Sequence, residues 1–270
     1  MDILDIIQEK YSSFSDSEKK IAMYILQKNN EIKNINISRL AELTATSSAT
    51  ITRFCRKIGC ESFVDMKIRI SSSQQDVITI EEEGIFNEVF SFYNRVIERT
   101  KKNLVKEDID TFIAEIEKAS RIFVYGVGSS GLTAMEFNQR LVRMGLNCSA
   151  NTDSHLMVIN STIVKKDDLV IGISSSGSTR EVLDSLHIAK ENGARIVAIT
   201  SFQASDLTRL SDLSLTVYSS SFVDNNLFVN SQFALMYLID VVSMMLLEQE
   251  DHSYTMSQTI DAILKKNPSE

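Results

Sequence analysis

The chain has 270 residues, a formal net charge of −8, one proline and nine glycines. Its 43% of hydrophobic residues is enough for a buried core, and so little proline and glycine excludes collagen-like, proline-rich and low-complexity chains. The acidic start lacks the basic region of a signal peptide, the longest apolar stretch (233–247) is too short to span a membrane, and the three cysteines lack metal-site spacing. We therefore expect a cytoplasmic protein with reduced thiols, no metal and no membrane segment.

The charge is distributed unevenly along the chain. Residues 1–77 carry a net charge of +1 and residues 78–270 a net charge of −9, while residues 38–70 contain six basic and three acidic side chains. A locally basic element on an acidic protein is typical of a small nucleic-acid-binding module joined to a larger acidic domain.

The first 75 residues have the pattern of several short helices. Ser15 and Glu18 have the spacing of a capping box, and apolar residues at helical spacing follow to about residue 29. We expect further helices over 2–12, from a cap at Ser38 to 43, from 47 or 48 to a terminating Gly59, and over 62–71. The polar and charged residues of 71–84 indicate a linker.

Residues 38–58 predict a helix, a tight turn and a second helix, which together form a helix-turn-helix. In the second helix, Ile51, Phe54, Cys55 and Ile58 would form the buried stripe. A recognition helix needs small or hydroxyl-bearing residues at its start and cations further on, and the remaining positions supply them: Ser48, Ala49, Thr50, Thr52, Arg53, Arg56 and Lys57. We expect Arg53 to read a guanine edge and the two later cations to contact phosphates. An ordinary three-helix packing unit with a solvated basic face stays open as an alternative.

From residue 121 the pattern changes to strands that alternate with helices. Two helices, over 85–104 and 106–119, precede this region, and a long helix (about 228–247) and a terminal helix follow it. Strands are expected at 122–125, 147–150, 169–173, 195–200 and 213–217. Continuous apolar strands alternating with helices predict a parallel sheet that is covered on both faces.

Two of these strands end in loops of small residues. Seven of the nine glycines lie between positions 126 and 193, and the loops are Gly126-Val127-Gly128-Ser129-Ser130-Gly131 and Ser174-Ser175-Ser176-Gly177-Ser178-Thr179. Both should open at the carboxyl edge of the sheet, where open α/β folds bind ligands. Glycine lets the backbone approach an anion, and helix amides and hydroxyls donate hydrogen bonds to it. We expect both loops to converge on one phosphate group.

Two other interpretations of the loops stay open. The first loop fits G-x-G-x-x-G, and Asp153 lies at a suitable distance downstream for a ribose contact, which is the pattern of a dinucleotide site. That interpretation gives the second loop no role. Alternatively, the glycines serve only as turn residues and the hydroxyls only as helix caps.

Together these motifs resemble a known family. Gly126–Ser130 with Ser174-x-Ser176-Gly177-x-Thr179 is similar to the SIS (sugar isomerase) domain, and Leu40-Ala41-Glu42-Leu43 with Ser48–Gly59 is similar to the helix-turn-helix of RpiR-type transcriptional regulators. The two parts, in this order, cover nearly the whole chain. The resemblance implies an all-α helix-turn-helix domain at 1–75, a linker at 76–84, and a three-layer α/β SIS domain at 85–270 whose parallel-sheet core lies at about 121–218.

The resemblance also implies a function: a regulator whose binding to double-stranded operator DNA is controlled by a sugar phosphate. It places the phosphate on the loop residues, with His155 and Glu181 as further candidates near the sugar, and the loop set is Gly128, Ser129, Ser130, Ser174, Ser175, Ser176, Gly177 and Thr179. Related regulators often have an arginine before the last long helix, but residues 229–233 contain none, so no sugar specificity is carried over there. The family implies a homodimer or homotetramer, and the sugar phosphate would act as an effector and not as a cofactor.

Some SIS proteins are isomerases or lyases, which need an acid/base pair near the sugar carbons. The three histidines and the scattered carboxylates of this chain form no such pair that the sequence identifies. We therefore expect a sensor and not an enzyme. A dinucleotide-sensing regulator and a phosphosugar isomerase or lyase are the alternatives.

Overall fold

The computed structural model of the chain describes residues 3–72, 84–222 and 229–266. These residues form two compact units, a helical one built mainly from residues up to Val96 and an α/β one built mainly from the residues after it. The division falls inside α7 (Ile85–Asn103), and most of the predicted linker at 76–84 lies outside the described residues. Among the described helices, none combines the length and the apolar character that crossing a membrane requires.

The helical unit is built from short helices around one apolar core. Ile21, Leu40 and Phe54, from three different helices, are fully buried there. The predicted capping box is present, because Ser15 accepts from the Glu18 amide and the Glu18 carboxylate accepts from the Ser15 amide. The helices are α1 (Ile3–Glu9), α2 (Asp16–Gln27), α3 (Asn29–Ile32), α4 (Ile37–Leu43), α5 (Ser48–Lys57) and α6 (Phe63–Ser72), with a 3₁₀ turn at Tyr11–Ser13.

Helices α4 and α5 form the predicted helix-turn-helix, with one error in the prediction. The residue that caps α4 is Asn36, whose side chain accepts from the Arg39 amide at 2.8 Å, and not Ser38. Asn36 lies one residue before the first helical position, where a side-chain oxygen can reach the free amides. The helix therefore begins two residues earlier than predicted, at Ile37.

Both helices of this motif end in a left-handed residue. After α5 the residue is the predicted Gly59, with φ of 84°, and the Cys60 amide donates back to the Cys55 carbonyl at 2.8 Å. After α4, Ala45 has the same left-handed geometry, with φ of 50°. Because a Cβ crowds the backbone in this region, Ala45 makes the tight turn at a cost in free energy.

The α/β unit contains a five-stranded, all-parallel sheet in the order β2-β1-β3-β4-β5. Its strands are β1 (Arg121–Tyr125), β2 (Cys148–Asn151), β3 (Asp168–Ile173), β4 (Arg195–Thr200) and β5 (Leu213–Thr216). β3 and β4 are almost entirely buried, which explains their continuous apolar sequences. The predicted fold class, helical N-terminal region and parallel α/β domain, is confirmed.

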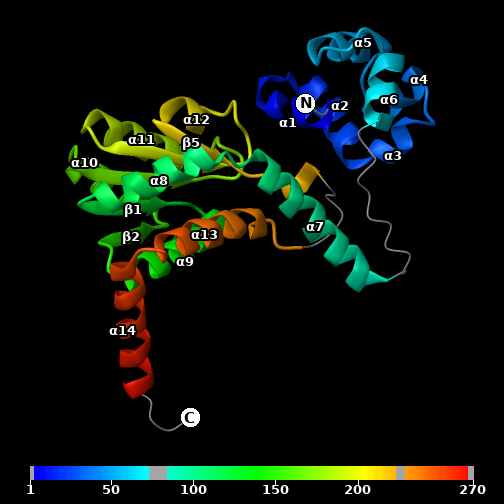
Figure 1. Cartoon of the computed structure of the whole chain (residues 1–270). Coiled ribbons are helices and arrows are strands. Elements are labelled where there is room, and N and C mark those ends of the chain that lie inside the picture. The colour runs from blue at the N-terminus through cyan, green and yellow to red at the C-terminus, as the bar shows by residue number, and fades with distance from the viewer. Residues whose placement is uncertain (1–2, 73–83, 223–228, 267–270) are drawn as a thin grey trace. The chain divides into compact units, whose positions relative to one another are not determined.

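Helices cover both faces of the sheet (Figure 1). One face packs on α10 (Ser154–Ile163), α11 (Arg180–Glu191) and α12 (Asp206–Leu210), where Met157, Leu186 and Leu207 join the core. The helices of the other side are α8 (Lys106–Lys118), α9 (Ser129–Arg143) and α13 (Phe233–Leu246), and α14 (Glu250–Lys266) follows. The sequence did not predict α10 and α12. It predicted that the long helix begins at about residue 228, which lies outside the described residues, whereas α13 begins at Phe233.

Candidate functional site

The two predicted loops follow neighbouring strands. β1 and β3 pair directly, and the chain order of the sheet reverses between them, because β2 lies beyond β1 while β4 and β5 lie beyond β3. In open parallel sheets, this reversal opens a crevice at the carboxyl ends of the two strands. The loop 126–131 follows β1 and the loop 174–179 follows β3, so both border the crevice.

The glycines of the first loop are required by close packing. A Cβ on Gly126 would lie 2.6 Å from the carbonyl oxygen of Ser130, and a Cβ on Gly131 would lie 2.9 Å from the carbonyl oxygen of Gly126. Gly128 has φ of 58° and is the N-cap residue of α9, so no side chain at this position caps the helix. The first turn of α9 thus presents its backbone amides, with Ser129 exposed and Ser130 buried.

The second loop is organised by its own hydroxyls. The buried Ser174 hydroxyl lies 2.8 Å from the Thr179 hydroxyl and accepts a hydrogen bond from the Gly177 amide at 3.1 Å. Gly177 has φ of 64°, and a Cβ there would lie 2.3 Å from Ser205, so no other residue fits. Ser176 is exposed and its oxygen accepts from the Ser178 amide. The hydrogen bonds of the loop therefore centre on the buried Ser174 hydroxyl.

The helices that follow these loops begin differently from their neighbours. Thr179 is the N-cap residue of α11, but its side chain makes no cap, because it is bonded to Ser174. By contrast, Asp153 caps α10 by accepting from the Leu156 amide at 3.0 Å, and Ser205 caps α12. Uncapped helix starts with free amides and a positive dipole end bind phosphate and other anions. The Asp153 carboxylate, which a dinucleotide site would use for the ribose, thus uses one of its two oxygens as a helix cap.

Gln232, which directly precedes α13, contacts both loops and is a candidate site residue that the sequence did not indicate. Its side chain is 7% exposed and lies between the two loops. The amide oxygen accepts from Ser130 (3.4 Å) and Thr133 (3.2 Å), and the amide nitrogen donates to Ser175 (3.4 Å). No sequence signal distinguishes this glutamine from an ordinary polar residue at a helix start, because the three partners are far away in the chain.

The two residues predicted near the sugar lie on the helices that follow β2 and the second loop. His155 is exposed on the first turn of α10, and Glu181 is exposed on the first turn of α11. Among the described residues, neither side chain is hydrogen-bonded to a loop hydroxyl. His252 has a structural role, because its ring nitrogens lie 2.9 Å from the Met144 carbonyl and 2.7 Å from the Glu117 carboxylate.

The surface of α5 in the helical unit only partly matches its prediction. The stripe of Ile51, Phe54, Cys55 and Ile58 is buried, as predicted. The exposed residues are Ala49, Arg53, Arg56 and Lys57, whereas the predicted Ser48, Thr50 and Thr52 are half-buried. Local hydrogen bonds hold the hydroxyls: Ser47 caps the helix through the Thr50 amide, and Thr52 donates to the Ser48 carbonyl.

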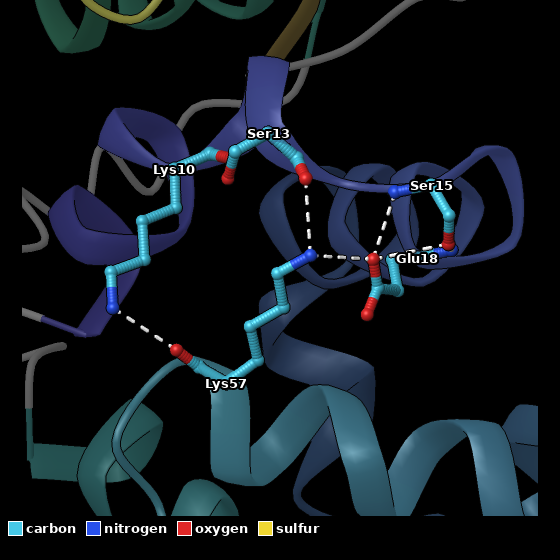
Figure 2. A network of polar contacts seen from close by, with 5 residues as sticks. All are labelled: Lys10, Ser13, Ser15, Glu18 and Lys57. Atoms are coloured by element: carbon cyan, nitrogen blue, oxygen red, sulfur yellow. Dashed lines mark hydrogen bonds and ion pairs between the residues drawn. The ribbon is translucent and has the colours of Figure 1, made fainter.

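Lys57 is tied back to its own domain, as Figure 2 shows. Its ammonium group donates to the Ser13 carbonyl at 3.0 Å and forms an ion pair with Glu18 at 2.9 Å, while its own carbonyl accepts from Lys10. Burial alone would raise the pKa of Glu18, but hydrogen bonds from Lys57 and Ser15 outweigh it and lower that pKa. Lys57 therefore joins α5 to α2, and Arg53 and Arg56 are the outward-facing cations of α5.

Comparison with known proteins agrees with this architecture. Residues 1–76 match the helix-turn-helix domain of the rpiR family, and residues 115–245 match the SIS domain. A helix-turn-helix type transcriptional regulator of Caldanaerobacter subterraneus is 31% identical over 92% of both chains. The regulator HexR of Pseudomonas aeruginosa is 26% identical over 89% of this chain and 87% of its own.

A solved structure has the same fold. It is the Vibrio vulnificus NanR protein in complex with ManNAc-6P, which matches 97% of this chain and 98% of its own with a TM-score of 0.62 and 23% identity. The fold and the motifs thus define a transcriptional regulator with a helix-turn-helix and a SIS domain. The chain belongs to the RpiR family of helix-turn-helix transcriptional regulators.

Proposed function

We propose that this regulator binds operator DNA through α5 and that a sugar phosphate in the SIS domain controls this binding. The observation that carries the proposal is the pair of loops at neighbouring strand ends, each leading into a helix start that no side chain caps. Two such starts offer one phosphate group several amide and hydroxyl donors at once. A complex of NanR with ManNAc-6P is known for the same fold, which supports the choice of ligand class.

Control of DNA binding requires only that the ligand prefers one of two conformations. The proposed sequence of events is that the phosphate binds the loop hydroxyls and amides, the SIS domain changes its conformational equilibrium, and the spacing or freedom of the recognition helices changes. Arg53 and Arg56 are the proposed DNA contacts, Arg53 at a base edge and Arg56 at a phosphate, because both guanidinium groups face outward on α5.

The proposal includes a homo-oligomer, because a near-palindromic operator needs two recognition helices. Exposed apolar residues on α10 support it: Leu156, Ile159 and Ile163 recur at helical spacing and are each at least half exposed. Exposed apolar residues that gather on one face of a helix are typical of a surface that another subunit covers. We place the protein in the cytoplasm, together with its proposed DNA target.

We further propose that the protein is not an enzyme. Isomerisation needs a base beside the sugar carbons, and the two candidates, His155 and Glu181, are solvent-exposed side chains without a hydrogen-bonded partner among the described residues. Turnover of any hexose phosphate by the purified protein would contradict this part of the proposal.

A thermal-shift screen tests the ligand class. The purified protein is titrated with glucose 6-phosphate, fructose 6-phosphate, glucosamine 6-phosphate and N-acetylmannosamine 6-phosphate. The unphosphorylated sugars are the controls, and NAD and NADH test the alternative of a dinucleotide sensor. We expect at least one phosphosugar to raise the unfolding temperature and its free sugar to have no effect. A shift with NADH and none with any phosphosugar would instead indicate a dinucleotide sensor.

The DNA-binding part is tested with Arg53→Ala. An operator is first selected from a random-sequence library with the wild-type protein. Loss of one base contact should cost about 1–3 kcal/mol and relax the sequence preference at one position of each half-site. Unchanged sequence-specific binding in a gel-shift assay would remove Arg53 from the proposed interface.

A further inference from the structure

We infer that Gln232 is the positioning residue of the phosphate site, because it sets the direction in which the serine hydroxyls of the two loops point their hydrogens. The inference rests on the proposed function and assigns a role to a residue outside both loops. Gln232 precedes α13, and its backbone amide donates to the Asn230 side chain at 2.8 Å, which fixes the residue at the helix start.

The two ends of the Gln232 amide face different loops. The oxygen can only accept, and it faces the hydroxyls of Ser130 and Thr133 on α9. The nitrogen can only donate, and it faces the hydroxyl of Ser175 in the second loop and that of Ser231. One buried side chain therefore joins both loops to the start of α13.

This arrangement has a consequence for Ser175. A serine hydroxyl has one hydrogen to donate and two lone pairs to accept with. Because Gln232 donates to the Ser175 oxygen, the single hydrogen of that hydroxyl must point elsewhere, and it is available to a phosphate oxygen. The Ser130 hydroxyl points its hydrogen at the Gln232 oxygen at 3.4 Å, and the Thr133 hydroxyl shares its hydrogen between that oxygen at 3.2 Å and the Ser129 carbonyl at 3.3 Å. These are long bonds that a stronger anionic acceptor can replace.

Gln232→Glu separates this role from a purely structural one. A carboxylate has the same shape and can accept from the hydroxyls of Ser130, Thr133, Ser175 and Ser231 together, so the fold should be kept. However, it would draw the Ser175 hydrogen away from the ligand and place a negative charge beside the phosphate. We expect an unfolding temperature close to that of the wild type and an affinity for phosphosugars at least about 100-fold weaker, since hydrogen bonds to charged groups are strong and like charges repel.

Two further variants serve as controls. Gln232→Met keeps the length of the side chain but removes both hydrogen-bonding ends, and we expect an affinity about 10-fold weaker. Ser231→Ala removes only the acceptor that lies outside both loops, and we expect no change in affinity. Binding of inorganic phosphate and of the four hexose 6-phosphates is measured by calorimetry for each variant, together with the unfolding temperature.

The possible results separate this inference from the proposed function. If the wild type binds none of the probes, the proposed function fails and this inference fails with it. If the wild type binds a phosphosugar and Gln232→Glu binds it equally well, only the role of Gln232 is contradicted. If both Gln232 variants lower the unfolding temperature and keep the wild-type affinity, Gln232 supports the fold alone and the inference is wrong. Should Gln232→Glu not fold, the affinity of Gln232→Met decides in the same way.

Discussion

Helices α5 and α11 begin in opposite ways, although both start with a hydroxyl residue at the N-cap. At α5, the Ser47 hydroxyl accepts from the Thr50 amide, so the chain itself satisfies the helix start. At α11, the Thr179 hydroxyl is bonded to Ser174, and the first amides receive no side-chain cap. A missing cap costs a helix about 1 kcal/mol. The difference teaches that α5 uses its N-cap hydroxyl for stability, whereas α9 and α11, which follow the two loops, begin without a side-chain cap, as the proposed binding of an external anion requires.

The largest expected effect comes from removing hydroxyls at the open start. Ser176→Ala together with Thr179→Ala should weaken phosphosugar binding by about 100-fold or more, because two hydrogen bonds to a charged group are lost. DNA binding without the sugar should stay at the wild-type level, since α5 lies in the other unit. Calorimetry and fluorescence anisotropy on the selected operator measure the two properties. A double variant that still responds to the sugar would show that the loop hydroxyls are not its binding site.

A second comparison concerns the two adjacent cations at the end of α5. Arg56→Ala should weaken operator binding and lower the slope of log K against log salt concentration by about 1, as expected for one lost phosphate contact. Lys57→Ala should lower the unfolding temperature and leave that slope nearly unchanged, because the Lys57 ammonium is held by Ser13 and Glu18. Salt titrations of both variants decide the matter. An equal decrease of the salt-dependence slope in Lys57→Ala would show that this lysine leaves Ser13 and Glu18 and contacts DNA.

Removing the N-cap hydroxyl should lower the free energy of unfolding more at α5 than at α11. Ser47→Ala should destabilise the helical unit by about 1 kcal/mol, because the Thr50 amide loses its acceptor. Thr179→Ala should have a smaller effect on unfolding, since its hydroxyl caps nothing and its partner Ser174 keeps the hydrogen bond from the Gly177 amide. Urea unfolding of the two variants provides the measurement. If Thr179→Ala destabilises as much as Ser47→Ala, the start of α11 depends on that hydroxyl for its stability and the contrast disappears.

The smallest effect is expected at the turn of the helix-turn-helix. Ala45 holds a φ of 50°, which glycine adopts without crowding. Ala45→Gly should therefore stabilise the helical unit by about 0.5–1 kcal/mol, after the greater freedom of glycine in the unfolded chain is subtracted. Thermal unfolding measures the gain. A lower unfolding temperature would mean that the Ala45 methyl group makes a packing contact worth more than the strain.

The sequence was informative where structure is local or repeats. The capping box at Ser15, the buried stripe of α5, the strands and the two glycine loops were predicted from short patterns, and family resemblance joined them into one protein. Asn36 was missed as a cap because Ser38, two residues later, is an equally good capping residue by type. The contact of Lys57 with Glu18 and the contact of Gln232 with Ser130 were missed because both join residues more than thirty positions apart in the chain.

The most direct test of phosphate binding at the open helix starts is an amide chemical-shift titration of the isotope-labelled protein with a phosphosugar. The amides of Ser130 at α9, and of Arg180 and Glu181 at α11, should move strongly downfield as they acquire a phosphate acceptor. The Leu156 amide at α10 is the internal control, because the Asp153 carboxylate already occupies it at 3.0 Å. If the sugar saturates the protein while the α9 and α11 amides keep their shifts, the phosphate binds elsewhere and the two loops are not its site.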